Sequence, residues 1–160
     1  MLLNSHQVAE HLQTNGLGAK AQVGYDLTLK SIKRIMGGAV TQDKTVVEEY
    51  LEVTPFQNAN DKYMFKLTPG VYSLTFDQGC KLPSNVTAFI RHRSSILRCG
   101  AEITSGVYDP GFEVDEMGGV MFAHRELVIE KGARVAQIIM FENTPADLYD
   151  GQFQKNKDVK

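Results

Sequence analysis

The sequence has few cysteines and no long apolar run, and each absence excludes a class of protein. Its two cysteines, Cys80 and Cys99, form neither a CxxC pair nor a spaced framework, so we expect no disulfide scaffold and no zinc site. The four histidines share no metal-ligand spacing either. No 18 apolar residues run together, and the first residues lack a basic region followed by an apolar core. We therefore expect a cytoplasmic protein without membrane contact and without a metal site of its own.

The sequence also lacks a large excess of either positive or negative charge. The 17 lysines and arginines nearly balance the 19 aspartates and glutamates, which gives a net charge of -2. The cations are local and do not spread along one face, which argues against a nucleic-acid partner. A small-molecule ligand suits this balance better.

The chain contains mostly short, alternating segments between turns. With 160 residues and 42% hydrophobic side chains, it predicts one domain over 1–160. Gly-Gly, Pro-Gly and Lys-Gly pairs separate runs in which apolar and polar residues alternate, as in β-strands. The expected strands cover 71–76, 86–90, 119–123, 127–129 and 134–141. These runs predict an all-β fold.

The run 134–141 differs from the others because it is apolar on nearly both faces. Such a strand is expected at the centre of a two-layer packing or at a subunit contact. Gln137 is its polar exception, and a buried amide needs partners, either in a site or within an ordinary core.

One helix is expected, at the N-terminus. Asn4 can cap it with Gln7 at the third helical position, and Asn15-Gly16 would end it after about a dozen residues. The polar stretch 41–61 has no clear period, and we interpret it as strand and loop.

Arginines and hydroxyls gather after the expected strand 86–90. Three arginines and two serines lie within eight residues, as an anionic, phosphate-rich ligand requires. If a short helix begins at Ser94, then its backbone N–H groups, Ser95 and the guanidinium groups of Arg93 and Arg98 could converge on one anion. The alternative is that the serines simply cap a helix and the arginines are solvated.

A second candidate is the turn from Asp109 through Pro110 and Gly111 to Phe112. It offers a carboxylate beside an aromatic ring. Asp-Pro-Gly is also a common turn in which the carboxylate caps its own backbone, so the turn alone leaves both interpretations open.

The order of these motifs resembles the dCTP deaminase and trimeric dUTPase superfamily over nearly the whole chain. The matching segments, in order, are Tyr25-Asp26-Leu27-Thr28-Leu29, Arg93-Ser94-Ser95 with Arg98, Asp109-Pro110-Gly111-Phe112, and Gly132 with Ala136-Gln137. The resemblance implies a distorted β-barrel or jelly roll, dUTPase-like and of the β-clip type, assembled as a homotrimer with active sites shared between chains.

The resemblance also implies roles for individual residues. Arg93, Ser94, Ser95, Arg98 and Gln137 match residues that hold the triphosphate. Asp109 matches the aspartate that contacts the deoxyribose and orients the attacking water, and Phe112 matches an aromatic position beside the sugar. Mg²⁺ arrives on the triphosphate. The candidate catalytic residues are therefore Asp109, Arg98 and Ser94.

Two departures bear on the reaction. Deaminases of this superfamily carry a proton-shuttling glutamate where this chain has Gly119, and glycine cannot transfer a proton. Glu116 lies three residues upstream, on the opposite face of a regular strand unless a bulge at Gly118-Gly119 re-aims it. The tail resembles the closing segment of the deaminase branch, so we expect 148–160, with Phe153 and Gln154, to close over the nucleotide.

This residue inventory favours a dUTP diphosphatase that yields dUMP and pyrophosphate. One alternative is dCTP deamination, bifunctional or on a modified cytosine nucleotide. Another is a nucleotide-binding trimer without turnover, although retention of Asp109 speaks against it.

Overall fold

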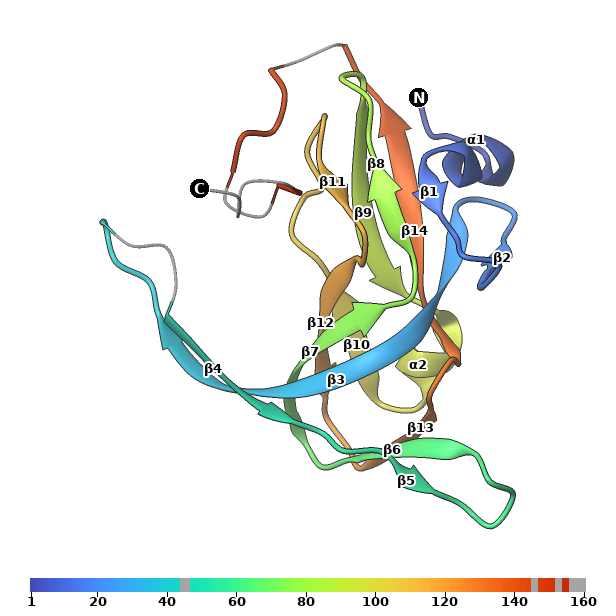
Figure 1. The fold of residues 1–160 in the computed structure, drawn as a ribbon, viewed down its shortest axis with the longest axis vertical. Helices are drawn as coiled ribbons and strands as arrows, with labels where there is room; N and C mark the ends of the chain where they lie inside the picture. The colour runs from blue at the N-terminus through green and yellow to red at the C-terminus, as the bar shows by residue number, and fades with distance from the viewer. Residues whose placement is uncertain (44–46, 145–146, 152–153, 156–160) are drawn as a thin grey trace.

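The computed structural model describes the chain except for residues 44–46, 145–146, 152–153 and 156–160 (Figure 1). Two short helices accompany fourteen strands among the described residues. In chain order the elements are α1 (Ser5–Glu10), β1 (Leu12–Gln13), β2 (Ala19–Lys20), β3 (Tyr25–Ala39), β4 (Val47–Glu52), β5 (Phe56–Gln57), β6 (Tyr63–Leu67), β7 (Gly70–Phe76), β8 (Gly79–Lys81), β9 (Val86–His92), α2 (Ser94–Arg98), β10 (Ala101–Thr104), β11 (Glu113–Val114), β12 (Gly118–Ala123), β13 (Leu127–Glu130) and β14 (Arg134–Glu142).

The main sheet closes on itself, which makes the fold a distorted antiparallel barrel. Its strand order is β14-β9-β10-β12-β7-β3-β2, β4 pairs with β3, and β14 pairs with both β9 and β3. Two small sheets, β1-β8-β11 and β13-β6-β5, cover parts of the barrel. The predicted all-β class with a short N-terminal helix is confirmed.

The five predicted strands all form. In β7 the buried side chains of Tyr72, Leu74 and Phe76 alternate with half-buried ones, as the period of two requires. The buried residues form one continuous core. No helix in the described part of the chain is long and apolar enough to cross a membrane.

The N-terminal helix begins as predicted but ends early. The Asn4 side chain accepts hydrogen bonds from the backbone N–H groups of His6 and Gln7, and the Gln7 side chain accepts from Asn4 N, which completes a capping box. α1 ends at Glu10, because Leu12–Gln13 pairs with β8. A sheet contact from a distant segment therefore replaces the last expected helical turn.

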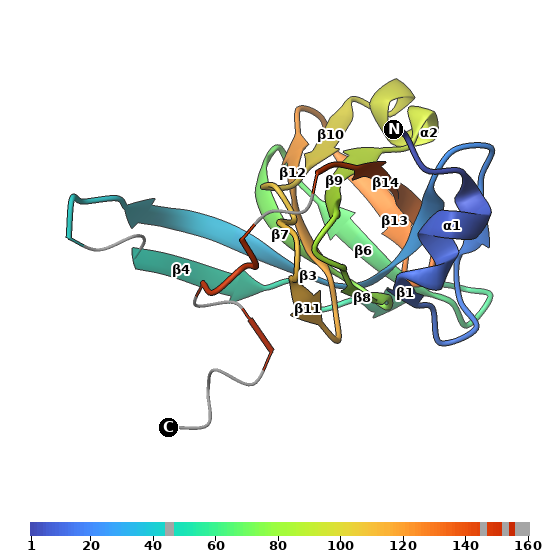
Figure 2. The same ribbon diagram turned by 90° about the horizontal axis from the view of Figure 1, so that it is seen from above.

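The segment 41–61 contains β4 and β5, in agreement with its interpretation as strand and loop. β4 pairs with the distal half of β3, and the two form a ribbon that projects from the barrel (Figures 1 and 2). The closed part of the barrel, where β3 meets β14 and β7, lies at the other end of β3.

The two cysteines differ in burial and should differ in reactivity. Cys80 is completely buried in β8, and burial raises the pKa of its thiol to about 12, whereas Cys99 is exposed. We expect iodoacetamide at pH 8 to modify Cys99 readily and Cys80 only in denaturant, as mass spectrometry of the native protein would reveal. Cys99→Ser is the control and should leave no fast-reacting thiol. Rapid labelling of Cys80 in that variant would mean that β8 does not stay packed.

Candidate functional site

A polar cavity of about 450 Å³ opens where β9, β14 and β3 meet, near the start of α2. Its lining residues are Lys20, Ala21, Gln22, Asp26, His92, Arg93, Ser94, Arg134 and Gln137. Three of these side chains are lysine or arginine and one is an aspartate, so the cavity has a net positive charge with histidine neutral. Such a lining suits a phosphate-bearing ligand.

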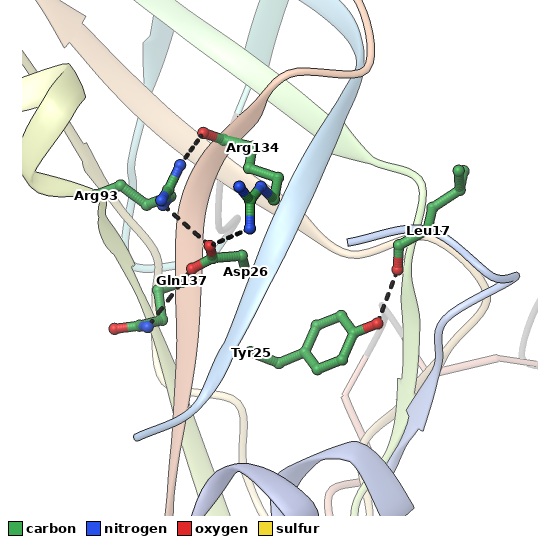
Figure 3. Close-up of polar contacts among 6 residues, drawn as sticks. All are labelled: Leu17, Tyr25, Asp26, Arg93, Arg134 and Gln137. Atoms are coloured by element: carbon green, nitrogen blue, oxygen red, sulfur yellow. Dashed lines mark hydrogen bonds and ion pairs between the residues drawn. The ribbon is translucent and has the colours of Figure 1, made fainter. Parts of the chain in front are cut away.

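Asp26 connects the charged side chains of this cavity. It is only 4% exposed, and its Oδ2 lies 3.1 Å from Arg93 Nε and 3.4 Å from Arg134 Nη1 (Figure 3). Gln137 Nε2 donates to Oδ1 at 3.5 Å. Arg93 Nη1 also donates to the backbone carbonyl of Arg134 at 3.1 Å. The amide of Gln137, which is half-buried, thus finds its partner here, at a charged site.

A β-bulge brings Arg134 to this cluster. Arg134 lies opposite Thr28, whereas Ala136 lies opposite Leu27, so β14 contains one extra residue between them. Beyond the bulge, Gln137 lies opposite Asp26. In a regular strand, residues 134 and 137 would face opposite sides, and the bulge places both beside the same carboxylate.

The loop before β3 forms another wall of the cavity. The Tyr25 hydroxyl donates to the carbonyl of Leu17 at 2.8 Å and fixes this loop against β3 (Figure 3). Gly18 has φ +81°, and a Cβ there would lie 2.3 Å from the carbonyl oxygen of Asp26. Only glycine allows so close an approach, which brings 20–22 to the cavity rim.

The structure brings together only part of the predicted phosphate-binding set. Arg93, Ser94 and Gln137 line the polar cavity, whereas Ser95 and Arg98 lie exposed on α2 and do not line it. α2 begins at Ser94 as predicted, with Arg93 as its N-cap residue, but no side chain caps it.

A second cavity, of about 600 Å³, lies beside the turn at Asp109. Its lining is Ser73, Ser105, Gly106, Val107, Tyr108, Phe112, Val114, Glu116, Gly118, Gly119, Val120 and Tyr149. Apolar and aromatic groups predominate, as expected of a pocket for a flat, weakly polar group. Phe112 is the member of the predicted site that lies here.

Tyr108 shapes the floor of this second cavity. Its hydroxyl donates to Gly118 O at 2.6 Å and accepts from Gly118 N at 3.0 Å. Burial is the main reason that the pKa of this phenol lies well above its ordinary value, so the hydroxyl stays protonated. The Tyr108 ring packs edge-on against Phe112 at 5.2 Å, and Phe112 packs in the same way against Tyr149 at 5.1 Å.

The Asp109 carboxylate is exposed on a tight turn in which Phe112 N donates to Asp109 O at 3.1 Å. Tyr108 and Ala88 form antiparallel hydrogen bonds, so the chain after Tyr108 runs toward the start of β9 and Asp109 lies on that side. Arg93 lies five residues beyond Ala88 in the other direction. At about 3.3 Å per residue, those five residues span roughly 16 Å. The two predicted functional groups of one chain are therefore far apart.

The region of the missing glutamate contains no bulge. β12 pairs with β7 in one unbroken register from Gly118 to Ala123, and Glu116 precedes this strand. Glu116 lines the second cavity, where its carboxylate forms an ion pair with Lys30. A Cβ at Gly119 would lie 3.1 Å from Thr104 O and 3.4 Å from Phe76 Cε2, so an acid at this position would crowd the core.

The described part of the tail packs on the turn of its own chain. Tyr149 N donates to Pro110 O at 2.7 Å, and Gln154 Nε2 donates to Gly111 O at 3.0 Å. Gln154 Oε1 also accepts from Glu113 N at 3.1 Å. Phe153, which was predicted to close over the ligand, lies outside the described residues. Gln154 thus contacts the backbone of the Asp109–Phe112 turn.

Three site residues were not predicted as such. Asp26 was noted only as part of a motif, although a charged residue within the apolar run 25–29 was an available signal. Arg134 could be found only from the bulge, and Tyr108 only from its contact with Gly118. In the described part of the chain, no three His, Cys, Asp or Glu side chains gather as a metal-binding group.

Comparison with known proteins agrees with this fold and motif order. The profile described as dCTP deaminase-like matches residues 3–143. A protein of Methanosarcina acetivorans named probable deoxyuridine 5′-triphosphate nucleotidohydrolase is 30% identical over 161 residues, covering 96% of this chain and 92% of that protein. The deoxyuridine 5′-triphosphate nucleotidohydrolase of Methanocaldococcus jannaschii is 36% identical over 124 residues, covering 76% of this chain and 77% of that protein.

Among solved structures, the 2′-deoxycytidine 5′-triphosphate deaminase of Agrobacterium tumefaciens superposes with a TM-score of 0.62. The match covers 87% of this chain and 47% of that one at 15% identity, so it supports the fold alone. Since the family profile spans nearly the whole barrel and a relative is similar along almost its full length, the chain belongs to the dCTP deaminase-like family.

Proposed function

We propose that this protein hydrolyses dUTP to dUMP and pyrophosphate. The observation that carries the proposal is the pairing of a cationic cavity at Arg93 and Ser94 with an apolar cavity that has glycine at position 119. The first suits a triphosphate. The second suits a pyrimidine deoxyribose, and its carboxylate, Glu116, is held in an ion pair with Lys30, while position 119 has no side chain to transfer a proton to the base. The names of the relatives from Methanosarcina acetivorans and Methanocaldococcus jannaschii point the same way.

In the proposed mechanism, water attacks the α-phosphorus in line with the pyrophosphate leaving group. Asp109 positions and polarises this water, which suits its exposed carboxylate on a rigid turn. Arg93 neutralises charge that develops on the phosphates, and Ser94 and Gln137 donate hydrogen bonds to them from the same cavity. The resemblance assigns Ser95 and Arg98 to the same phosphates, although they do not line this cavity within one chain. Phe112 packs beside the sugar and Tyr149 completes the aromatic wall.

Mg²⁺ enters this scheme with the nucleotide. Asp26 is the acidic residue that lines the polar cavity, and its oxygens already accept from two arginines and a glutamine. Such a donor set suits a metal ion that the triphosphate brings and that keeps most of its water ligands. The cytoplasmic location expected from the sequence belongs to this proposal as well.

We propose further that the active site is shared between the chains of a homotrimer. Asp109 and Arg93 of one chain are too far apart to act on one α-phosphate, since β9 separates them by roughly 16 Å. A second copy must therefore supply one of them. On the outward face of β9 and β14, Phe89, Ile139 and Phe141 form a partly exposed apolar patch, in which Phe89 packs edge-on against Phe141, as a subunit contact requires.

Deamination of dCTP remains the second candidate because Glu116 lines the apolar cavity. The ion pair with Lys30 and the unbroken register of β12 disfavour it, since both hold this carboxylate away from a proton-transfer role. A nucleotide-binding trimer without turnover is the third candidate.

The first test is product analysis with the purified protein, Mg²⁺ and either dUTP or dCTP. We expect dUMP and pyrophosphate from dUTP and no uracil nucleotide from dCTP. Asp109→Asn should lower kcat for dUTP by about 100-fold or more, because it removes the group that orients the water. Asp61→Asn, at an exposed carboxylate that lines neither cavity, is the control and should leave kcat unchanged. An Asp109→Asn enzyme within about threefold of the parent would exclude the assigned role.

Shared sites predict complementation between two defective variants. We expect Asp109→Asn and Arg93→Gln proteins to be nearly inactive separately, because each lacks one half of every site. Co-expressed in equal amounts, they should regain about one quarter of the parental activity, since one random chain pairing in four restores both groups. If the two variants formed mixed oligomers and the activity did not rise, each chain would act alone.

The tail contacts predict a binding role for residues after Asp147. A chain ending at Asp147 loses Tyr149 and Gln154, so the apolar cavity loses a wall and the turn loses its backbone partners. We expect KM for dUTP to rise about tenfold or more, or turnover to be lost. A chain ending at Lys155 keeps the described contacts and serves as the control. Equal KM values for the two truncated chains would remove the closing role.

A further inference from the structure

We propose that Arg134 is a second phosphate-binding arginine of the polar cavity and that Asp26 is a positioning residue for both Arg93 and Arg134. The inference rests on the proposed function for the identity of the nucleotide. The anion site itself rests on contacts within one chain, and a probe without a base can test it.

The hydrogen-bond donors of Arg93 are already partly used. Its Nε pairs with Asp26 and its Nη1 donates to the carbonyl of Arg134, so one edge of the guanidinium group faces protein. Nη2 of Arg93 forms no hydrogen bond or ion pair with another described residue. Arg93 therefore presents a fixed but reduced set of donors to a ligand.

Arg134 retains more donors at the same cavity. Only its Nη1 contacts Asp26, at 3.4 Å, while its side chain is 48% exposed and lines the cavity. Its Nε and Nη2 form no hydrogen bond or ion pair with another described residue. A guanidinium group with one edge open can bind two phosphate oxygens at once, which makes Arg134 the better placed of the two for a bidentate contact.

Asp26 explains how two guanidinium groups remain side by side. Like charges at this distance repel one another, and a carboxylate between them offsets the repulsion. Because Asp26 is buried and Gln137 Nε2 donates to its second oxygen, the carboxylate is fixed in place. Its rigidity then sets the directions of both arginines before any ligand arrives.

The test measures binding of inorganic tripolyphosphate and of the non-hydrolysable analogue α,β-imido-dUTP by calorimetry with Mg²⁺ present. We expect Arg134→Gln to raise Kd for both ligands about tenfold or more, because charge-assisted hydrogen bonds are lost. Binding of deoxyuridine should not change. Lys131→Gln is the matched control, since it removes the same charge from an exposed position that does not line the cavity, and it should raise either Kd by less than about twofold. An Arg134→Gln protein that binds tripolyphosphate as the control does would overturn the role of Arg134.

Asp26→Asn separates positioning from simple charge. If Asp26 were only a negative charge near the ligand, its removal would tighten binding of tripolyphosphate. A positioning role predicts the opposite, a Kd raised about fivefold or more, together with a smaller effect of Arg134→Gln when both changes are combined. Unchanged deoxyuridine binding reports that the variant is folded. Tighter binding, or fully additive effects of the two changes, would overturn the positioning role.

These outcomes also separate this inference from the proposed function. If the parent protein bound tripolyphosphate through Arg134 but did not hydrolyse dUTP, the anion site would be supported. The proposal that dUTP is the substrate would be overturned. If the parent and the Arg134→Gln variant hydrolysed dUTP equally well, the proposed substrate would stand and the phosphate-binding role of Arg134 would be overturned.

Discussion

The pairing of β14 with β3 is the contact on which the rest of the structure depends. It closes the main sheet into a barrel and places Gln137 opposite Asp26. Arg93, which directly follows β9, contacts Asp26 at the same place. Buried charge is tolerated there because the carboxylate accepts from two guanidinium groups and an amide. The strand pairing that completes the core therefore also assembles the polar cavity, so stability and ligand binding depend on the same register.

Much of the barrel could be predicted because strand formation depends on local alternation and turn residues. The five expected strands all form, and Asn4 caps α1 as its side chain and that of Gln7 require. The early end of α1 could not be predicted, since it depends on pairing between Leu12 and Cys80, which are distant in sequence. Local propensity decides where a helix begins here, and a tertiary contact decides where it ends.

The site was predictable in part for a similar reason. Arg93, Ser94 and Gln137 carry residue types that suit phosphate, and they do line one cavity. Ser95 and Arg98 lie outside it, and the distance between Asp109 and Arg93 follows from the strand pairing of Tyr108 with Ala88. Motif order indicates which residues belong to a function, but only the fold decides which of them one chain can bring together.

The bulge in β14 has a consequence for how relatives of this chain should be compared. One unpaired residue at position 135 turns Arg134 from the face that alternation predicts to the face that Asp26 occupies. A relative that lacked this single residue would keep the arginine and the glutamine in the same order along the chain. In such a relative the two residues would be two positions apart, so a regular strand would still place both side chains on the same side of the sheet. A one-residue gap in an alignment of this strand would therefore leave the arginine beside the cavity. A relative of equal length whose strand paired without the bulge would instead turn the arginine away from the cavity, even where every aligned amino acid is identical.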